Sequence, residues 1–306
     1  MRRRNMSSTS NDAGSDAGGY ASAAYVRALG QQPLPFGATG GHLIQRPVGT
    51  LTDLSGPYPL FTCQTWTALS EAVATLPQGP VTLTLVADPF NALGEAALAA
   101  IFPICRKLHD HWVVGLAAPP MLSRHHRQKL RRAPAPRIES GPADPGFGPA
   151  WANLYANLVQ RKDIRDARAF SPASLTAQLS VPGAHLVTAW KGETLLGADL
   201  YYLDQRRAVA HLSAYAPEGY AGSVSYPMLA AALDYLRPLA EVLDLGGAPA
   251  GPSGQGIADF KQGWTAQTLP SFLCGKVLDA GAYLALAPTA DPQGYFPAYR
   301  AAEFRR

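Results

Sequence analysis

The stretch Val242–Trp264, reading VLDLGGAPAGPSGQGIADFKQGW, combines two ionisable side chains with a Gly/Pro-rich loop. Asp244 lies in a short apolar run that predicts a buried strand, and Gly246 and Gly247 end that run where the backbone turns or approaches another group closely. Lys261 follows the loop on a single predicted helical turn. A carboxylate can cap such a turn or accept a proton, and an ammonium can stabilise a phosphate or an oxyanion. We therefore expect a ligand site here, with an ordinary surface connection as the alternative.

His211 lies on an earlier predicted strand and shares a strand face with Val209 and Ser213. A helix connects this strand to the one that carries Asp244, and such a crossover is typical of parallel neighbours. We therefore expect His211 and Asp244 to face one gap between adjoining strands. The alternatives are a hydrogen-bonded core histidine and an aspartate that only caps the following turn.

The second half of the chain predicts two helices, a three-stranded antiparallel meander with a bulge near Gly197, a loop, a helix and a returning strand. These elements are expected at Trp151–Val159, Pro172–Leu179, His185–Trp190, Thr194–Leu203, Ala208–Ala214, Ala216–Ser225, Ser225–Leu236 and Val242–Leu245. The helical turn with Lys261 is expected at Ile257–Gln262, after an irregular loop up to Gly256.

The first half alternates helices and strands, which indicates an α/β unit. The expected helices are Tyr20–Leu29, Trp66–Leu76 and a long one at Ala92–Asp110, and the expected strands are Val81–Val86 and Trp112–Ala117. Between them, Tyr58 and Phe61 lie in a constrained loop, and we expect both to pack inward rather than contact a ligand.

Composition indicates a globular chain of one large or two medium domains, with 306 residues that are 47% hydrophobic and 16% charged. The three cysteines are widely separated, so we expect neither a disulfide framework nor a metal site, and a reducing cytoplasm is the expected location. No apolar run reaches the roughly 18 residues of a membrane helix. Residues 1–19 lack the apolar core of a signal peptide and are expected to be a disordered tail.

Ser123–Ala133 predicts a basic helix, followed by a Pro/Gly-rich linker at Pro134–Pro149 that we take as the domain boundary. The helix is a candidate contact for RNA or another polyanion, and a solvated surface helix is the alternative because no aromatic side chain is interleaved. Its candidate contact residues are Arg124, Arg127, Lys129, Arg131 and Arg132.

The order of three antiparallel strands, a loop, a helix and a parallel strand is the layout of GNAT acyltransferases. Asp244-Leu245-Gly246-Gly247, Gly256-Ile257 and Phe260-Lys261-Gln262-Gly263-Trp264 resemble the D-x-G-G … G-[LI]-x-x-F-K-x-G-[FW] pattern of FemA/FemB-type aminoacyl and acyl transferases. The resemblance covers residues 123–286. It implies an α/β fold with a GNAT-like mixed sheet flanked by helices, in two tandem units: a degenerate first unit at 20–120, the basic helix and linker at 121–149, and a second unit with the donor site at 150–306.

The resemblance also implies an N-acyltransferase that moves an acyl or aminoacyl group to an amine. The expected co-substrate is an acyl-CoA or an aminoacyl-tRNA, with no bound cofactor, and the expected acceptor is a small-molecule or peptide amine. A base must take the amine proton and a donor must stabilise the oxyanion, so the candidate catalytic residues are His211, Asp244 and Lys261. We expect tRNA as a partner in the aminoacyl case, and neither DNA nor a membrane span.

The donor site departs from the pattern of coenzyme A enzymes. Those enzymes present [QR]-x-x-G-x-[GA] before the helix, whereas this loop reads PEGYAGSV over residues 217–224. The helix N-terminus that follows can still bind an anion. The expected donor-binding residues are Ser213, Gly222, Ser223, Ser225, Tyr226, Gly246, Gly247 and Phe260. The competing interpretation is a catalytically silent GNAT-fold protein that binds RNA or another polyanion through its basic helix.

Overall fold

The computed structural model of the chain describes residues 17–133, 135–164, 169–249, 251–291 and 293–304. Most of the expected N-terminal tail lies outside these residues, but Gly19 belongs to a buried 3₁₀ turn, so the ordered chain begins slightly earlier than predicted. None of the helices in the described ranges is long and apolar enough to cross a membrane.

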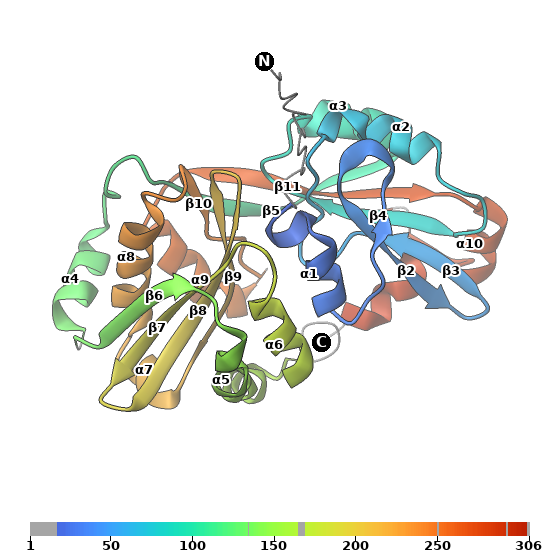
Figure 1. The fold of residues 1–306 in the computed structure, drawn as a ribbon. Helices are drawn as coiled ribbons and strands as arrows, with labels where there is room; N and C mark the ends of the chain where they lie inside the picture. The colour runs from blue at the N-terminus through green and yellow to red at the C-terminus, as the bar shows by residue number, and fades with distance from the viewer. Residues whose placement is uncertain (1–16, 134, 165–168, 250, 292, 305–306) are drawn as a thin grey trace, which may run out of the picture.

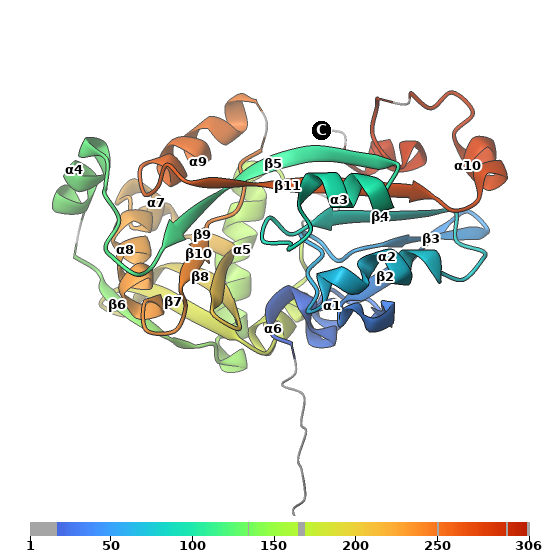
Figure 2. The same cartoon turned by 90° about the horizontal axis from the view of Figure 1, so that it is seen from above.

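The eleven strands of the described residues form one mixed sheet flanked by helices, with the order β1-β2-β3-β4-β11-β5-β10-β9-β8-β7-β6. The two long central strands, β5 (Ile104–Gly115) and β11 (Thr268–Val277), run across both halves of the molecule, as Figures 1 and 2 show. They pair with each other and connect β4 of the first half to β10 of the second. The C-terminal strand therefore completes the sheet of the N-terminal half.

The first half packs short helices on one face of its strands. A core of Leu43, Leu54, Leu83, Leu85 and Phe272 is covered by α2 and α3. The elements before β5 are η1 (Gly19–Ala21), α1 (Ala23–Ala28), β1 (Leu34–Pro35), η2 (Gly37–Thr39), β2 (His42–Val48), β3 (Leu51–Ser55), η3 (Trp66–Ala68), α2 (Leu69–Ala74), β4 (Thr82–Ala87) and α3 (Gly94–Ile101).

The long helix predicted over Ala92–Asp110 is wrong. Only α3 is helical, and the chain from Ile104 onward belongs to β5. Pro103 lacks an N–H group and disfavours a helical conformation at the residue before it, and Phe102 is accordingly extended with φ of −115° and ψ of 115°. The apolar residues of this segment therefore serve two elements rather than one helix.

The second half follows the predicted order closely. Its meander β7-β8-β9 is antiparallel, β10 lies parallel to β9, and a bulge lies beside Gly197, where a Cβ would come within 2.3 Å of the Tyr215 ring. The elements are α4 (Arg124–Arg132), β6 (Arg137–Pro142), η4 (Pro145–Phe147), α5 (Gly148–Lys162), α6 (Pro172–Leu179), β7 (Ala184–Lys191), β8 (Thr194–Asp204), β9 (Arg207–Tyr215), α7 (Pro217–Ala221), α8 (Ser225–Leu236), β10 (Val242–Asp244), α9 (Pro252–Gln262), α10 (Ala280–Leu286) and η6 (Ala298–Phe304).

Three segments that were expected to be irregular contain regular structure. Within Pro134–Pro149, six residues form the edge strand β6, where prolines are tolerated because one side of the strand needs no partner. The loop after β9 contains the short helix α7. Helix α9 begins at Pro252 rather than Ile257, because proline at the first helical positions loses no hydrogen bond.

Two apolar cores lie on opposite faces of the second-half sheet. One face packs against α5 and α6 around Trp151, Tyr155 and Leu200, together with Tyr20 and Tyr25 from the N-terminal segment. The other face packs against α8 and reaches α9 through Trp264. The expected α/β fold, with a large mixed sheet flanked by helices, is confirmed.

Candidate active site

The parallel strands β9 and β10 pair over a short distance and then separate. Val242–Asp244 lies opposite Arg207–Val209, after which β10 ends and Gly246, with φ of 77°, turns the chain away. β9 continues to Tyr215, and on that edge it has no strand partner among the described residues. The predicted parallel neighbours are confirmed, and an open strand edge lies beside the end of β10.

Asp244 is fully buried at this end of β10 and holds a histidine from the first half of the chain. Its carboxylate accepts the N–H of Gly246 at 2.7 Å, and both of its oxygens lie 3.0–3.1 Å from Nδ1 of His111 on β5. Because an ionised carboxylate only accepts hydrogen bonds, Nδ1 carries the proton and Nε2 is left as an acceptor. Asp244 therefore caps the glycine turn, as one alternative predicted, and it also fixes the orientation of His111.

Lys261 points from α9 back to the same turn. Its Nζ donates to the carbonyl of Gly247 at 2.5 Å. Burial lowers the pKa of Lys261 to about 8, and the charge of Asp244 partly opposes that shift. A Cβ at Gly246 would lie 3.4 Å from Nζ, so the ammonium packs directly against this turn.

His109 lies two residues from His111, close to Lys261 and the glycine turn. A Cβ at Gly247 would come within 2.9 Å of the Cβ of His109, so the turn passes directly over this histidine. Burial, together with the charges of His111 and Lys261, lowers the pKa of His109. His109 is therefore neutral near pH 7 and adds no second cation beside Lys261.

His211 is not part of this cluster, and the predicted gap shared with Asp244 is corrected. Its Nδ1 lies 2.8 Å from the hydroxyl of Tyr20 and its Nε2 lies 2.9 Å from Oε1 of Gln178. Its ring also packs on Tyr25 and Tyr202, and burial lowers its pKa to about 3. With both nitrogens occupied, His211 is the hydrogen-bonded core histidine of the alternative interpretation.

A bulge at His211 also moves Ser213 to the opposite strand face. The pairing of β9 with β8 shifts by one residue there, and Ser213 lies opposite Asp199. Ser213 hydrogen-bonds Asp199, whose carboxylate also accepts the Tyr215 hydroxyl at 2.8 Å. Burial raises the pKa of Asp199 to about 6 despite these bonds. This buried carboxylate had no sequence signal, because two of its partners, Ser213 and Tyr215, reach it only through the pairing of β9 with β8.

The expected donor-binding residues at the start of α8 lie against the basic helix. Ser223, with φ of 55°, accepts a hydrogen bond from Lys129 of α4 at 3.4 Å, and the Lys129 ammonium also lies 5.9 Å from the ring centre of Tyr226. Tyr226 in turn packs edge-on against Phe260, the residue before Lys261. Gly222 and Ser225 flank these residues in the same turn. The structure thus brings the start of α8 close to helix α4 and to Phe260 and Lys261 of α9.

Helix α4 itself is anchored by one buried histidine. His126 donates from Nε2 to the carbonyl of Phe260 at 2.7 Å, and a Cβ at Gly263 would lie only 1.9 Å from Cε1 of His126. The opposite side of the helix is solvent-exposed and basic, with Arg124, Arg127, Arg131 and Arg132. The predicted basic helix is confirmed, and its contact with a polyanion remains a prediction.

His111 is the functional candidate that the sequence did not reveal. The segment Leu108–Trp112 was divided between a predicted helix and a predicted strand, so the alternation that puts His109 and His111 on one strand face was hidden. Pro103 was the available signal, since a strand beginning after it would have placed both histidines together. Within the described ranges, no group of three or more His, Cys, Asp or Glu side chains could hold a metal ion.

Comparisons with known proteins identify the fold. Neither a family model nor a curated protein sequence matches the chain. Among solved structures, FemX superposes with a TM-score of 0.61 at 13% identity, covering 86% of this chain and 92% of FemX. L-PGS from Bacillus licheniformis gives a TM-score of 0.55 at 13% identity, covering 88% and 91% of the two chains. The C-terminal domain of a putative lysylphosphatidylglycerol synthetase from Agrobacterium fabrum gives 0.53 at 15% identity, covering 85% and 87%.

Proposed function

We propose that this chain, which has the FemAB-like, GNAT-type fold, is an N-acyltransferase that moves an acyl or aminoacyl group from an activated donor to an amine. The observation that carries the proposal is the arrangement at the end of β10, where the Lys261 ammonium and the His111–Asp244 pair meet beside the open edge of β9. The two requirements of amide formation, a proton acceptor and an oxyanion donor, are both available there.

In the proposed reaction the amine nitrogen attacks the donor carbonyl, and a C–N bond forms as the carbonyl oxygen becomes an oxyanion. Nε2 of His111 takes the amine proton, and Asp244 holds the imidazole in the tautomer that makes this possible. The Lys261 ammonium stabilises the oxyanion. Collapse then breaks the bond from the carbonyl carbon to the thioester sulfur or the ribose oxygen of the donor, and that leaving group takes the proton from the His111 imidazolium, which restores the base.

The pKa of Lys261 suits this role. With a pKa of about 8, the side chain is still mostly protonated near pH 7, so it can donate a hydrogen bond. The pKa of Lys261 is lowered because burial removes water from the ammonium. A negative charge that develops nearby is therefore a favourable partner for it. The loss of this charge above pH 8 sets the upper limit of the proposed activity.

The donor remains acyl-CoA or aminoacyl-tRNA, and we place its phosphates at the start of α8. Lys129 and the Ser223 hydroxyl supply one cation and one hydrogen-bond donor there, whereas the N–H groups of Val224, Tyr226 and Met228 already donate within the chain. Phe260 and Tyr226 supply an aromatic wall next to Lys261. Both donor classes exist in the cytoplasm, which is the location that this proposal requires.

The alternative function, polyanion binding without catalysis, is favoured by one observation: four exposed arginines on α4. Thermal unfolding with a panel of acyl-CoA thioesters and charged tRNAs separates the two functions. If the chain is an enzyme, one donor class should raise its melting temperature, and the rise should grow with donor concentration. Tyr226→Ala should reduce that rise. Stabilisation by uncharged RNA alone, falling steeply with salt and abolished by substitution of the α4 arginines, supports the alternative and contradicts the enzyme.

A further inference from the structure

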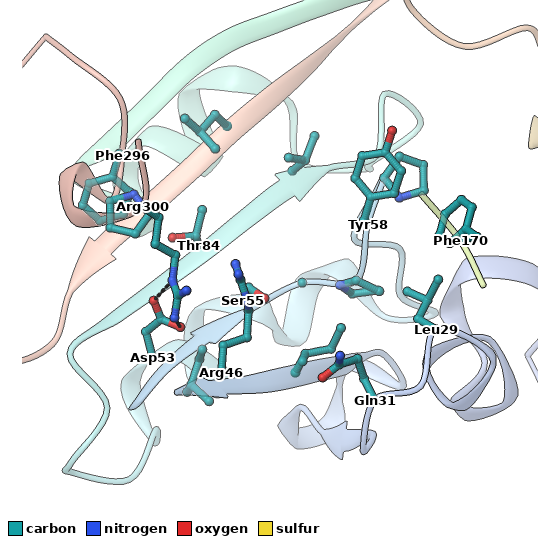
Figure 3. A pocket seen from close by; sticks show the side chains of 18 of the residues that line it. Leu29, Gln31, Arg46, Asp53, Ser55, Tyr58, Thr84, Phe170, Phe296 and Arg300 are labelled. Carbon is teal, nitrogen blue, oxygen red and sulfur yellow. Dashed lines mark hydrogen bonds and ion pairs between the residues drawn. The ribbon is translucent and has the colours of Figure 1, made fainter. Parts of the chain in front are cut away.

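A cavity of about 420 Å³ lies on one face of the first-half sheet, opposite the core that α2 and α3 cover. Val86 and Leu273 line it, and they alternate along β4 and β11 with the core residues Leu85 and Phe272. Figure 3 shows the cavity between the strands, the start of α6 and the C-terminal segment around Phe296. The volume lies within the range of small-molecule sites.

The cavity is pre-formed, because the loop that carries Tyr58 is held at both ends. Gly56 and Phe61 each donate an N–H to a carbonyl of β4, at 2.8 and 2.7 Å, and the Tyr25 hydroxyl donates to the carbonyl of Tyr58 at 2.6 Å. Tyr58, which was predicted to pack inward, is 40% exposed and lines the cavity, whereas Phe61 is buried as predicted. A ligand therefore binds here without the cost of reorganising this loop.

The larger part of the cavity wall is apolar, and one end of it is aromatic. The rings of Tyr58 and Phe170 lie beside each other at that end, with centres 6.3 Å apart and planes tilted by 52°. Apolar side chains continue the wall, from Leu29, Ile44, Val86, Leu273 and Phe296. Aromatic walls favour apolar groups with a ring, because ring contacts add to the burial of apolar surface.

The charges at the other end of the cavity are already paired within the protein. Arg300 donates from Nε and Nη2 to the two oxygens of Asp53, at 2.6 and 3.0 Å, and both residues are buried. Arg46 and Arg300 each donate to Glu303 at 2.6 Å. A charged ligand would have to displace one partner of these pairs, and an unpaired buried charge is costly. The cavity therefore favours an uncharged ligand.

The cavity is separate from the site at the end of β10. Ser271 of β11, which follows the sheet from the cavity towards that site, is fully buried, and His111 is 7% exposed. Neither of them lines the cavity, and Lys261 does not line it either. A molecule in the cavity therefore does not touch the groups that we assign to acyl transfer.

We propose that this cavity is a second binding site, for an uncharged and mainly apolar small molecule that carries an aromatic ring. The ring lies against Tyr58 and Phe170, and the apolar remainder lies on the sheet over Val86 and Leu273. This ligand is neither the donor nor the acceptor of the proposed reaction. Because Phe170 belongs to the second half and Phe296 to the C-terminal segment, the bound molecule contacts three parts of the chain at once and stabilises their packing.

The test is a fluorescence titration with two probes that share one ring system. N-phenyl-naphthylamine is uncharged, anilinonaphthalene sulfonate adds a negative charge to the same rings, and both become fluorescent when they leave water for an apolar site. We expect saturable binding of the neutral probe, a higher melting temperature in its presence, and binding of the sulfonate that is at least about tenfold weaker. Equal binding of the sulfonate, or no saturable binding of the neutral probe, overturns the inference.

Substitutions at two positions locate the neutral probe. Ser55→Phe places a ring in the cavity from β3 and should weaken binding at least about tenfold, whereas Ser55→Ala keeps the space open and should bind like the wild type. Tyr58→Ala removes a ring that is partly exposed and keeps the carbonyl that Tyr25 holds, so the variant should fold and bind at least about threefold more weakly. Unchanged binding in Tyr58→Ala, or in a Ser55→Phe variant that unfolds cooperatively, contradicts the site.

One further variant separates this inference from the proposed function. Lys261→Met removes the proposed oxyanion donor and should bind the neutral probe like the wild type, because Lys261 does not line the cavity. Loss of probe binding in Lys261→Met, or displacement of the probe by an acyl-CoA or a charged tRNA, would show that the cavity belongs to the transfer site and would overturn the inference. Intact probe binding in a protein that transfers no acyl group would reject only the proposed function.

Discussion

Replacing Lys261 by methionine removes the one ammonium at the end of β10 and keeps most of the aliphatic stem. The lost contact is the 2.5 Å hydrogen bond to the Gly247 carbonyl, together with the charge that would face the oxyanion. Removal of one oxyanion donor typically lowers turnover by about 100- to 1,000-fold, or about 3–4 kcal/mol of transition-state stabilisation. We expect a loss of this size for Lys261→Met. Lys261→Arg should rescue little, because a planar guanidinium does not fit the space of a compact ammonium.

The same substitution should not lower the free energy of unfolding, although it lowers turnover. A fall in the pKa of Lys261 from 10.5 to about 8 corresponds to a cost of at most about 3 kcal/mol for keeping the charge in the fold, and less where solvent screens it. Loss of one hydrogen bond costs about 1–2 kcal/mol. The free energy of unfolding at pH 7 should therefore be unchanged or higher in Lys261→Met.

The pH dependence gives this prediction a clear sign. Between about pH 8 and 10.5 the native state holds fewer protons at Lys261 than the unfolded state, so its contribution to the free energy of unfolding rises with pH in that window. Lys261→Met should lack this rise, and Lys191→Met, an exposed control, should keep it. The assay is thermal unfolding at pH 7 and pH 9.5 beside turnover at saturating donor. A melting temperature many degrees lower, or unchanged turnover, would show that Lys261 is structural and would refute the assignment.

Three further substitutions separate catalytic from structural residues. Asp244→Asn should lower kcat by about 100-fold or more with little change in the KM of the amine, because an amide N–H facing His111 selects the wrong tautomer; an unchanged kcat in steady-state kinetics would contradict this. His211→Phe should cost about 1–3 kcal/mol in denaturant unfolding and leave turnover per folded molecule intact. Since burial depresses the pKa of His211 from 6.5 to about 3, its contribution to stability should be lost as pH falls from about 6.5 towards 3, and the phenylalanine variant should lose less over that range. Gly263→Ala should destabilise by more than about 2 kcal/mol in the same unfolding assay, because its Cβ would lie 1.9 Å from His126; wild-type stability would show that α4 can move away.

The sequence predicted the second half well because its elements are short-range patterns. The alternation in Thr194–Leu203 and the helical spacing from Ser225 to Leu236 each specify an element without distant partners. A crossover helix between two strands then fixed β10 as the parallel neighbour of β9.

The remaining parts of the site depend on pairings that no local pattern contains. His111 meets Asp244 because β5 pairs with β10 across 133 residues of sequence, and the predicted helix at Ala92–Asp110 hid the strand that continues back from this pairing through His111. Ser213 was misplaced because a single extra residue in β9 changes which side chains share a face, and the bulge is defined by the register with β8. His211 was misassigned because its partners, Tyr20 and Gln178, come from distant segments of the chain. A buried carboxylate such as Asp199 is invisible for the same reason.

Product formation is the most direct test of the central claim that the end of β10 transfers an acyl group to an amine. The protein would be incubated with each acyl-CoA thioester or charged tRNA and a panel of peptide and small-molecule amines, and the products analysed by mass spectrometry. The account predicts an amine whose mass has increased by that of the acyl group, formed by the wild type and at least 100-fold more slowly by Lys261→Met. Absence of any such product with a donor that binds the protein, or equal product from Lys261→Met, would contradict it.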